Sequence, residues 1–168
     1  SGDIRSNWFS QAHEIAVKTI GIIGLGRIGS RLARRLQGWE CDLVYSDIVG
    51  PEEGLEDELH LTRLSIEDLL QTSDIVTLHV PLNRSTHHMI SDRELDLMKP
   101  TAMLINACRG PVVDEAALVR AIRENKIAMA ALDVTEVEPT PPDNPLFEFD
   151  NVLITPHLAA FAQESTKR

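Results

Sequence analysis

The glycine-rich segment GIIGLGRIG constrains the fold of this chain more than any other part of the sequence. Gly24, Gly26 and Gly29 have the G-x-G-x-x-G spacing, with a strand-like apolar run (19–24) before them and a helical pattern (26–39) after them. In this setting the first glycine permits a tight turn, the second lets backbone amides approach a pyrophosphate, and the third allows close helix–strand packing. The helix N-terminus adds unpaired N–H groups and partial positive charge. The segment therefore predicts a dinucleotide site, against the alternative of a merely structural glycine turn.

Short apolar runs alternate with helical patterns along the rest of the chain. Further strands are expected over residues 41–47, 61–64, 74–80, 102–108, 127–134 and 151–157. Further helices are expected over 65–73, 91–98 and 114–125, whereas the proline-rich stretch 139–145 must be a loop. Near-continuous apolar strands alternating with helices predict an α/β fold with a doubly wound, mostly parallel sheet.

Chemically versatile residues follow the ends of these expected strands. They are Gly24, Asp47, Val80-Pro81, Cys108-Arg109, Asp133 and His157. Parallel sheets bind their ligands outside the carboxyl ends of the strands, near a point where the strand order reverses. We therefore expect these residues to gather at one edge of the sheet.

Asp47 bears on which dinucleotide binds. A carboxylate at this strand end accepts hydrogen bonds from an adenosine ribose and repels a 2′-phosphate. Residues 48–51 contain no arginine or lysine that could neutralise such a phosphate. Asp47 therefore favours NAD over NADP, and the alternative is a solvated acidic residue.

Arg109 leaves the end of the apolar run 102–108. Gly110 and Pro111 follow it and restrict the backbone, which indicates a positioned side chain. A planar guanidinium suits a substrate carboxylate, and the alternative is a charge placed for solubility. Cys108 has no neighbouring base in the sequence, so we expect it to face the cofactor or the core rather than act as a nucleophile.

His157 follows the last expected strand. A lone histidine is more often structural than catalytic, but Glu136 and Glu138 close the preceding strand-end segment. A histidine–carboxylate pair can move protons near neutral pH, which makes His157 a candidate acid–base. The other histidines are expected at the surface (His13, His60, His87, His88) or facing the cofactor cleft (His79).

Composition argues against several other classes of function. The 168 residues suit one domain, and a formal charge of −10 disfavours non-specific nucleic-acid binding, which needs a basic face. No apolar run approaches the roughly 18 residues of a membrane span. The two cysteines form no disulfide framework, and with six scattered histidines they show no metal-ligand spacing. A reducing, cytoplasmic setting is expected.

Five segments together resemble one enzyme family. They are GIIGLGRIG, LHVPL, LINACRGPVVDEAAL, AALDVTEVEP and NVLITPHLAA. In this order they are similar to the D-isomer-specific 2-hydroxyacid dehydrogenases, which include phosphoglycerate dehydrogenases, glyoxylate/hydroxypyruvate reductases and D-lactate dehydrogenases. The resemblance implies a Rossmann NAD-binding domain over 19–157. It also implies an NAD-dependent oxidoreductase that transfers a hydride between nicotinamide and C2 of a small D-2-hydroxy or 2-oxo acid.

The resemblance implies a catalytic set of Arg109, Glu138 and His157. Arg109 would hold the substrate carboxylate and polarise the C2 carbonyl, and His157, paired with Glu138, would exchange a proton with its oxygen. Asp133 would hold the nicotinamide carboxamide. The residues expected at the cofactor are Gly24, Gly26, Arg27, Ile28, Gly29, Asp47, Val80, Pro81, Ala107, Cys108, Arg109, Asp133, His157 and Ala159. The sequence departs from the family at Thr135, where an aromatic is common, and at HLAAF, which replaces a more glycine-rich stretch.

The family also implies a domain organisation. Its enzymes have two domains, with the cofactor domain inserted in the substrate domain. Residues 1–18 are then expected to end a crossing helix or dimer arm, residues 158–168 to start the returning helix, and the substrate domain to be absent from this chain. The chain looks cut at both ends. A homodimer through the cofactor half is expected, with Trp8-Phe9 at a partner surface.

Two other functions remain open on the sequence. One is a non-catalytic, NAD-sensing interaction module like the corepressor relatives of the family, which can keep Arg109, Glu138 and His157. The other is an NADP-linked reductase, which Asp47 disfavours.

Overall fold

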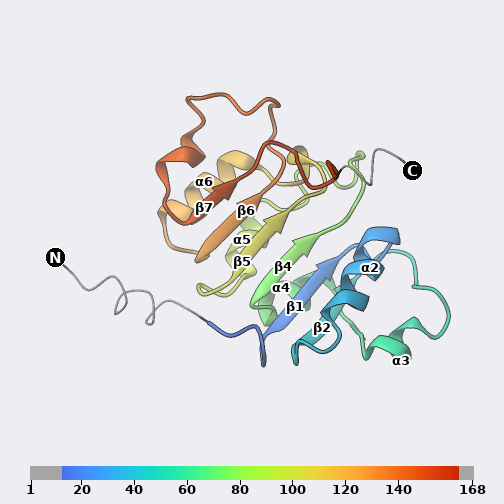
Figure 1. Cartoon of the computed structure of the whole chain (residues 1–168). Coiled ribbons are helices and arrows are strands. Elements are labelled where there is room, and N and C mark those ends of the chain that lie inside the picture. Colours follow the sequence, from blue (N-terminus) through green and yellow to red (C-terminus); the bar gives the residue numbers. More distant parts are fainter. Residues whose placement is uncertain (1–12, 163–168) are drawn as a thin grey trace.

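The computed structural model describes residues 13–162, and these form a parallel sheet with helices packed against it (Figure 1). The strand order is β3-β2-β1-β4-β5-β6-β7, and every neighbouring pair is parallel. The strands are β1 (Thr19–Ile23), β2 (Asp42–Ser46), β3 (Thr62–Arg63), β4 (Ile75–Leu78), β5 (Met103–Asn106), β6 (Met129–Leu132) and β7 (Val152–Ile154). The order reverses between β1 and β4, which is where a doubly wound sheet binds its ligand. The predicted fold is confirmed.

The four helices predicted between residues 19 and 157 are present, and three short elements are added. The helices are α2 (Arg27–Leu36), α3 (Leu55–Leu59), α4 (Ile66–Thr72), α5 (Asp92–Leu97) and α6 (Glu115–Arg123), with 3-10 turns η1 (Gly110–Val112) and η2 (Pro145–Glu148). The sequence did not predict α3, η1 or η2. η2 begins at the last residue of the predicted loop 139–145, and its start is capped by the Asn144 side chain, which accepts a hydrogen bond from Leu146 N–H.

The alternation of side chains along each strand divides the core between the two faces of the sheet. Ile23 and Val44 pack with α4, α5 and α6, whereas Ile22 and Tyr45 pack with α2 and α3 on the other side. Figure 1 shows the same division, with α2 in front of the sheet and α4 and α5 behind it. Burial on both faces explains why these strands are almost continuously apolar.

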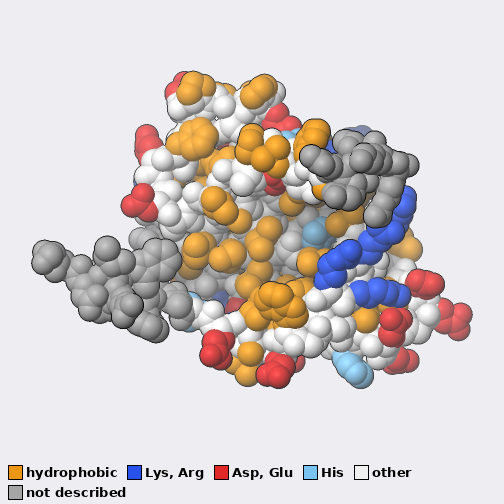
Figure 2. Space-filling view, in the orientation of Figure 1, with side chains coloured by type: hydrophobic (Ala, Val, Ile, Leu, Met, Phe, Trp, Pro, Cys, Tyr) orange, Lys and Arg blue, Asp and Glu red, His pale blue; other side chains and the backbone are white. Residues whose placement is uncertain are grey.

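One half of the front face carries no helix among the described residues. Met129 and Leu153 belong to β6 and β7, point to the side away from the α5–α6 core, and are 44% and 63% exposed. Figure 2 shows hydrophobic side chains gathered over this part of the sheet. The doubly wound arrangement is therefore complete over β1–β4 and open in front of β6 and β7.

The expected terminal helices are not seen in the parts that the structure describes. Residues 13–18 form a turn in which Val17 has a φ of +60° and donates its N–H to Glu40 O, so a helix cannot run through it. Residues 158–162 also form a turn. Trp8-Phe9 lies outside the described residues. Within residues 13–162, no helix is long and apolar enough to cross a membrane.

Candidate active site

The glycine-rich turn between β1 and α2 has the geometry that the sequence predicts. Gly24 has a φ of +93°, which favours glycine, and a Cβ there would lie 2.7 Å from the carbonyl oxygen of His79. A Cβ on Gly29 would collide with the carbonyl oxygen of Gly24, so the helix can pack this close only without a side chain. A Cβ on Gly26 would meet no atom within 4 Å. No neighbouring atom in this structure therefore excludes a side chain at position 26. The open space fits the close approach of a ligand to the backbone there.

The N-terminus of α2 faces solvent at this turn. No side chain among the described residues caps it, and its first turn carries no acidic residue. Arg27 and Ile28 are exposed, Ile28 by 69%. Unpaired N–H groups and the helix dipole therefore offer a site for a pyrophosphate.

Asp47 is tied directly to the glycine turn. One carboxylate oxygen accepts the N–H of Leu25 at 2.6 Å, and the other accepts the N–H of Val49 at 2.9 Å. Arg63 of β3 donates to the backbone carbonyl of Asp47 at 2.8 Å. The stretch 48–51 does lack a basic residue, but the sheet brings Arg63 beside Asp47 from a strand whose pairing the sequence could not reveal.

A buried asparagine shapes the turn that presents Arg109. Asn106, only 1% exposed, donates to the carbonyl of Arg109 at 3.0 Å and accepts the N–H of Cys108 at 3.1 Å. A Cβ on Gly110 would collide with the carbonyl of Thr135, so the turn lies directly against the next strand-end segment. The Arg109 side chain is exposed and bonds the carbonyl of Cys108. Asn106 is not among the residues predicted from the sequence, although a lone polar residue at the end of an apolar strand could have indicated it.

Cys108 packs against the core, as one of the predicted alternatives has it. Its thiol donates to Asn106 Oδ1 at 3.1 Å, and burial raises its pKa above the ordinary value despite opposing backbone hydrogen bonds. A thiol that resists ionisation is a poor nucleophile, and within residues 13–162 no base bonds it.

Glu138 and His157 form the predicted pair. His157 Nδ1 lies 2.9 Å from Glu138 Oε2, with 44% and 39% of the side chains exposed. The pair lines a groove at the carboxyl ends of β6 and β7, which Phe147 and Phe161 also border. Among the described residues no contact joins Arg109 to this pair, but Arg109, Glu138 and His157 follow three adjacent strands, β5, β6 and β7.

Asp133 organises the turn that carries His157. Its carboxylate accepts the hydroxyl of Thr155 at 2.6 Å and the N–H groups of Leu158 and Ala159, both at 2.8 Å. His157 has a φ of +54° and donates its N–H to the Asp133 carbonyl at 2.8 Å. Burial opposes ionisation, yet these donors lower the pKa of Asp133 below its usual value. Contact with a nicotinamide carboxamide stays a prediction.

The remaining predicted cofactor residues lie at the same edge. Val80 is half-buried beside Gly24, and the exposed ones are Pro81, Ala107 and Ala159. His79 is half-buried, with its ring nitrogen 3.0 Å from the Thr77 hydroxyl, and burial lowers its pKa.

The contacts of His88 differ from two expectations, one for His88 itself and one for Glu136. His88 is not an isolated surface histidine, because its Nε2 lies 2.7 Å from Glu136 Oε1. Glu136, which the sequence analysis placed in the company of His157, is thereby paired elsewhere. His13, His60 and His87 are exposed, as predicted.

Comparison with known proteins decides the family. The family model described as D-isomer specific 2-hydroxyacid dehydrogenase, NAD binding domain, matches residues 2–159. The chain belongs to this family. It is a D-2-hydroxyacid dehydrogenase NAD-binding domain, which confirms the resemblance and the predicted cofactor.

Curated relatives of this NAD-binding domain include glyoxylate reductases. That of Korarchaeum cryptofilum is 45% identical over 156 residues, covering 93% of the chain and 47% of the relative. That of Thermofilum pendens is 46% identical over 164 residues, covering 96% and 48%. The chain thus spans about half the length of the curated relatives it matches.

Solved structures of dehydrogenases superpose on the domain. The apo D-mandelate dehydrogenase of Rhodotorula graminis has a TM-score of 0.92 and 33% identity, covering 98% of this chain and 48% of that one. The D-lactate dehydrogenase of Lactobacillus jensenii, solved with NAD+, has a TM-score of 0.85 and 34% identity, covering 93% and 50%. The open space at Gly26, the uncapped α2 N-terminus and Asp47 fit NAD in this domain.

Proposed function

We propose that the protein containing this chain is an NAD-dependent oxidoreductase that interconverts a small D-2-hydroxy acid and its 2-oxo acid. The observation that carries the proposal is the Glu138–His157 pair, 2.9 Å apart in a groove at the sheet edge that also bears the glycine turn. A paired histidine beside a cofactor site is suited to move a proton to or from the substrate oxygen.

The three residues have separate roles in this mechanism. Arg109 holds the substrate carboxylate through two parallel hydrogen bonds and polarises the C2 carbonyl. Its exposed guanidinium exchanges its bond to the Cys108 carbonyl for the substrate. His157 gives a proton to the C2 oxygen in reduction and removes it in oxidation, while Glu138 holds Nδ1 and stabilises the charged ring. When bound, NAD(H) supplies or accepts the hydride at C2.

The test is a steady-state assay of the full-length protein against glyoxylate, hydroxypyruvate and pyruvate. NADH should support turnover, with kcat/KM about tenfold or more above that with NADPH, because Asp47 repels a 2′-phosphate. Arg109→Ala should raise KM and lower kcat, and Arg109→Lys should recover only part, since an ammonium lacks the planar fork. Arg31→Ala, an exposed arginine on α2, is the control. No turnover with any acid, or a wild-type rate for Arg109→Ala, would refute the proposal.

We also propose that a substrate domain outside this chain completes the enzyme. The chain covers about half of its curated relatives, and the open face of β6 and β7 leaves Met129 and Leu153 exposed. Further protein that covers this face would remove that apolar surface from water. Residues 1–18 and 158–168 would link the two domains.

The assembly and setting are proposals of the same kind. We expect a homodimer through the cofactor domain, in the cytoplasm. Light scattering on the full-length protein at micromolar concentration should give the mass of a dimer, and a monomer would contradict this. The relatives named above are dehydrogenases and reductases, so the alternative of an NAD-sensing interaction module gains no support from them.

A further inference from the structure

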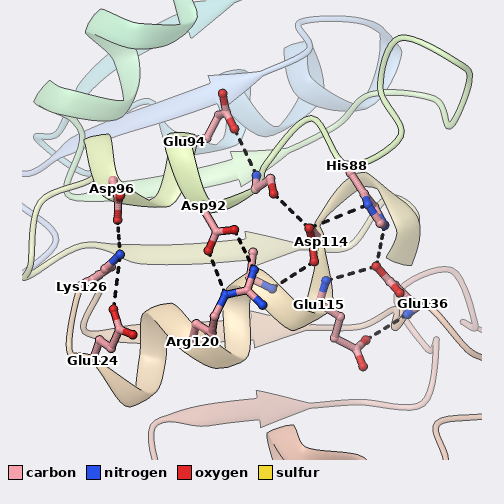
Figure 3. Close-up of polar contacts among 12 residues, drawn as sticks. His88, Asp92, Glu94, Asp96, Asp114, Glu115, Arg120, Glu124, Lys126 and Glu136 are labelled. Carbon is pink, nitrogen blue, oxygen red and sulfur yellow. Dashed lines mark hydrogen bonds and ion pairs between the residues drawn. The ribbon is translucent and has the colours of Figure 1, made fainter.

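A second histidine–carboxylate cluster joins His88 to the start of α6 and to Glu136 (Figure 3). His88 Nε2 lies 2.7 Å from Glu136 Oε1, and its Nδ1 lies 3.9 Å from Asp114 Oδ2. Glu115 joins it, because its N–H donates to Glu136 Oε1 at 3.1 Å. We call His88, Asp114, Glu115 and Glu136 the His88 brace. The mechanism above uses none of them.

Residues of the His88 brace form hydrogen bonds with the segment that carries Glu138. Glu136 N–H donates back to Glu115 Oε2 at 3.0 Å, so the two glutamates bond reciprocally. Asn144, at the far end of the same segment, donates its amide to Glu115 Oε1 at 2.7 Å. Glu138 lies between these two anchor points in the chain, exposed and paired with His157. The position of Glu138 therefore depends on how firmly Glu136 is held.

The His88 brace also contacts the turn that carries Arg109. The backbone N–H of His88 donates to the Pro111 carbonyl at 2.8 Å. On its other side, Gly110 is pressed against the backbone of Thr135 and Glu136. The Arg109 turn thus contacts the backbone of both His88 and Glu136. The His88 and Glu136 side chains also bond each other, so the turn lies between two residues that are joined directly.

We propose that His88 is a positioning residue, which sets the register between Arg109 and Glu138 by holding Glu136. This inference rests on the proposed function of the Arg109, Glu138 and His157 set. His88 touches neither Glu138 nor His157 in the contacts above, so it acts through Glu136.

The charges explain why a hydrogen-bond donor is needed at this place. Asp114 faces the same imidazole as Glu136, and its pKa is lowered chiefly by the N–H of Ala117, with burial opposing and Ser91 and His88 assisting. Without the imidazole, the Glu136 carboxylate would lose its shortest contact and face another carboxylate. A side chain displaced by about 1 Å near reacting groups can cost up to about a hundredfold in rate.

The test compares two variants of the full-length enzyme. His88→Leu removes the donor, whereas His88→Gln keeps an N–H donor that reaches Glu136. Since both carry a side chain on the same left-handed backbone, with φ of +51°, the strain is matched. We expect His88→Leu to lower kcat on the 2-oxo acid about tenfold with the dissociation constant for NADH unchanged, and His88→Gln to stay within about threefold of wild type. His87→Ala, which removes the ring stacked 4.0 Å away, should behave as wild type.

Either of two results overturns the proposal: a kcat for His88→Leu near that of wild type, or equal losses for His88→Gln and His88→Leu. If His88→Leu does not fold, His88→Asn replaces it, since asparagine tolerates the left-handed backbone but its amide is too short to reach Glu136.

Hydrogen–deuterium exchange separates this proposal from the proposed function. In His88→Leu or His88→Asn, amides of residues 110–116 and 135–140 should exchange faster than in the His87→Ala control. A wild-type protein without turnover on any 2-oxo acid defeats the proposed function, and the exchange result then decides the His88 brace alone. Unchanged exchange in both segments defeats the brace even in an active enzyme.

Discussion

At the residue scale, Gly26 and Gly29 belong to one motif but are glycine for different reasons. Gly29 is required by the protein, because a Cβ there would strike the carbonyl of Gly24. Gly26 has open space around its missing side chain, so we expect a requirement for glycine there to come from a ligand. The two effects can be separated by substitution.

Gly26→Ala should leave the free energy of unfolding nearly unchanged and weaken NADH binding about tenfold or more, because the methyl group occupies the path of the pyrophosphate. Gly29→Ala should lower the free energy of unfolding by about 2–3 kcal/mol through forced displacement of α2. Gly50→Ala is the matched control, as it too has no neighbour within 4 Å. Denaturant unfolding and NADH fluorescence titration measure the two quantities. Unaltered NADH affinity in Gly26→Ala would count against the site.

Cys108 should be dispensable, despite standing next to Arg109. Burial raises the pKa of its thiol, so little thiolate exists at neutral pH. Cys108→Ala should keep kcat/KM within about threefold, and the native thiol should alkylate slowly with iodoacetamide at pH 7. The interpretation fails if Cys108→Ala abolishes activity while Arg109→Ala does not.

Residues that act within their own segment were predictable, and those that act across segments were not. Asp47, Arg109 and His157 each follow a strand, so their places at the sheet edge follow from the pattern. The pairing of His88 could not be predicted, because its carboxylate partners come from residues far along the chain. The contact of Arg63 with Asp47 could not be predicted either, because it depends on the pairing of β3 with β2.

At the element scale, Asp74 holds the start of two strands together. Its carboxylate accepts the N–H of Thr19 at 2.9 Å and the ammonium of Lys99 at 3.0 Å. Its own N–H donates to the Thr19 carbonyl at 2.8 Å. Burial opposes ionisation, but the hydrogen bonds from Thr19 N–H and Lys99 lower the pKa of Asp74 below its usual value.

Asp74→Asn should therefore destabilise the protein at neutral pH but not in acid. A carboxylate whose pKa is lowered by folding stabilises the folded state fully above its unfolded pKa of about 3.9, and this stability is lost as pH falls through the folded pKa. The free energy of unfolding should drop on the order of 1 kcal/mol at pH 7. The difference from wild type should shrink as the pH falls through the folded pKa, which lies below the usual value. Asp143→Asn, in the exposed loop, is the control, and a difference that persists in acid would contradict the assignment.

The length of a helix decided whether the sequence pattern could predict it. Long amphipathic stretches such as α2 and α6 were found, because several turns repeat the same apolar face. α3 was missed since its five residues supply only Leu55 and Leu59 as buried positions. The strands end earlier than predicted, because residues such as Asp133 leave the sheet to bond the turns at its edge.

At the scale of the whole molecule, the isolated chain should bind NADH but turn over poorly. The glycine turn, the α2 N-terminus and Asp47 all lie within it, whereas the groove at Glu138 and His157 is open. A second domain that closes over this groove would exclude water and hold the substrate. We expect kcat for the isolated chain to be about a hundredfold or more below that of the full-length protein, with NADH affinity within about tenfold. Equal kcat values would show that no second domain is needed.

The most direct test is to follow deuterium from NADH that carries deuterium at both C4 positions, in the full-length protein, with whichever of pyruvate and hydroxypyruvate it reduces faster. We expect the D-2-hydroxy acid with deuterium at C2, and a rate about a hundredfold or more lower for His157→Ala, because the C2 oxygen then lacks its proton donor. Exposed His60→Ala should match wild type. Product without deuterium at C2, product of the L configuration, or an undiminished rate for His157→Ala would contradict the account.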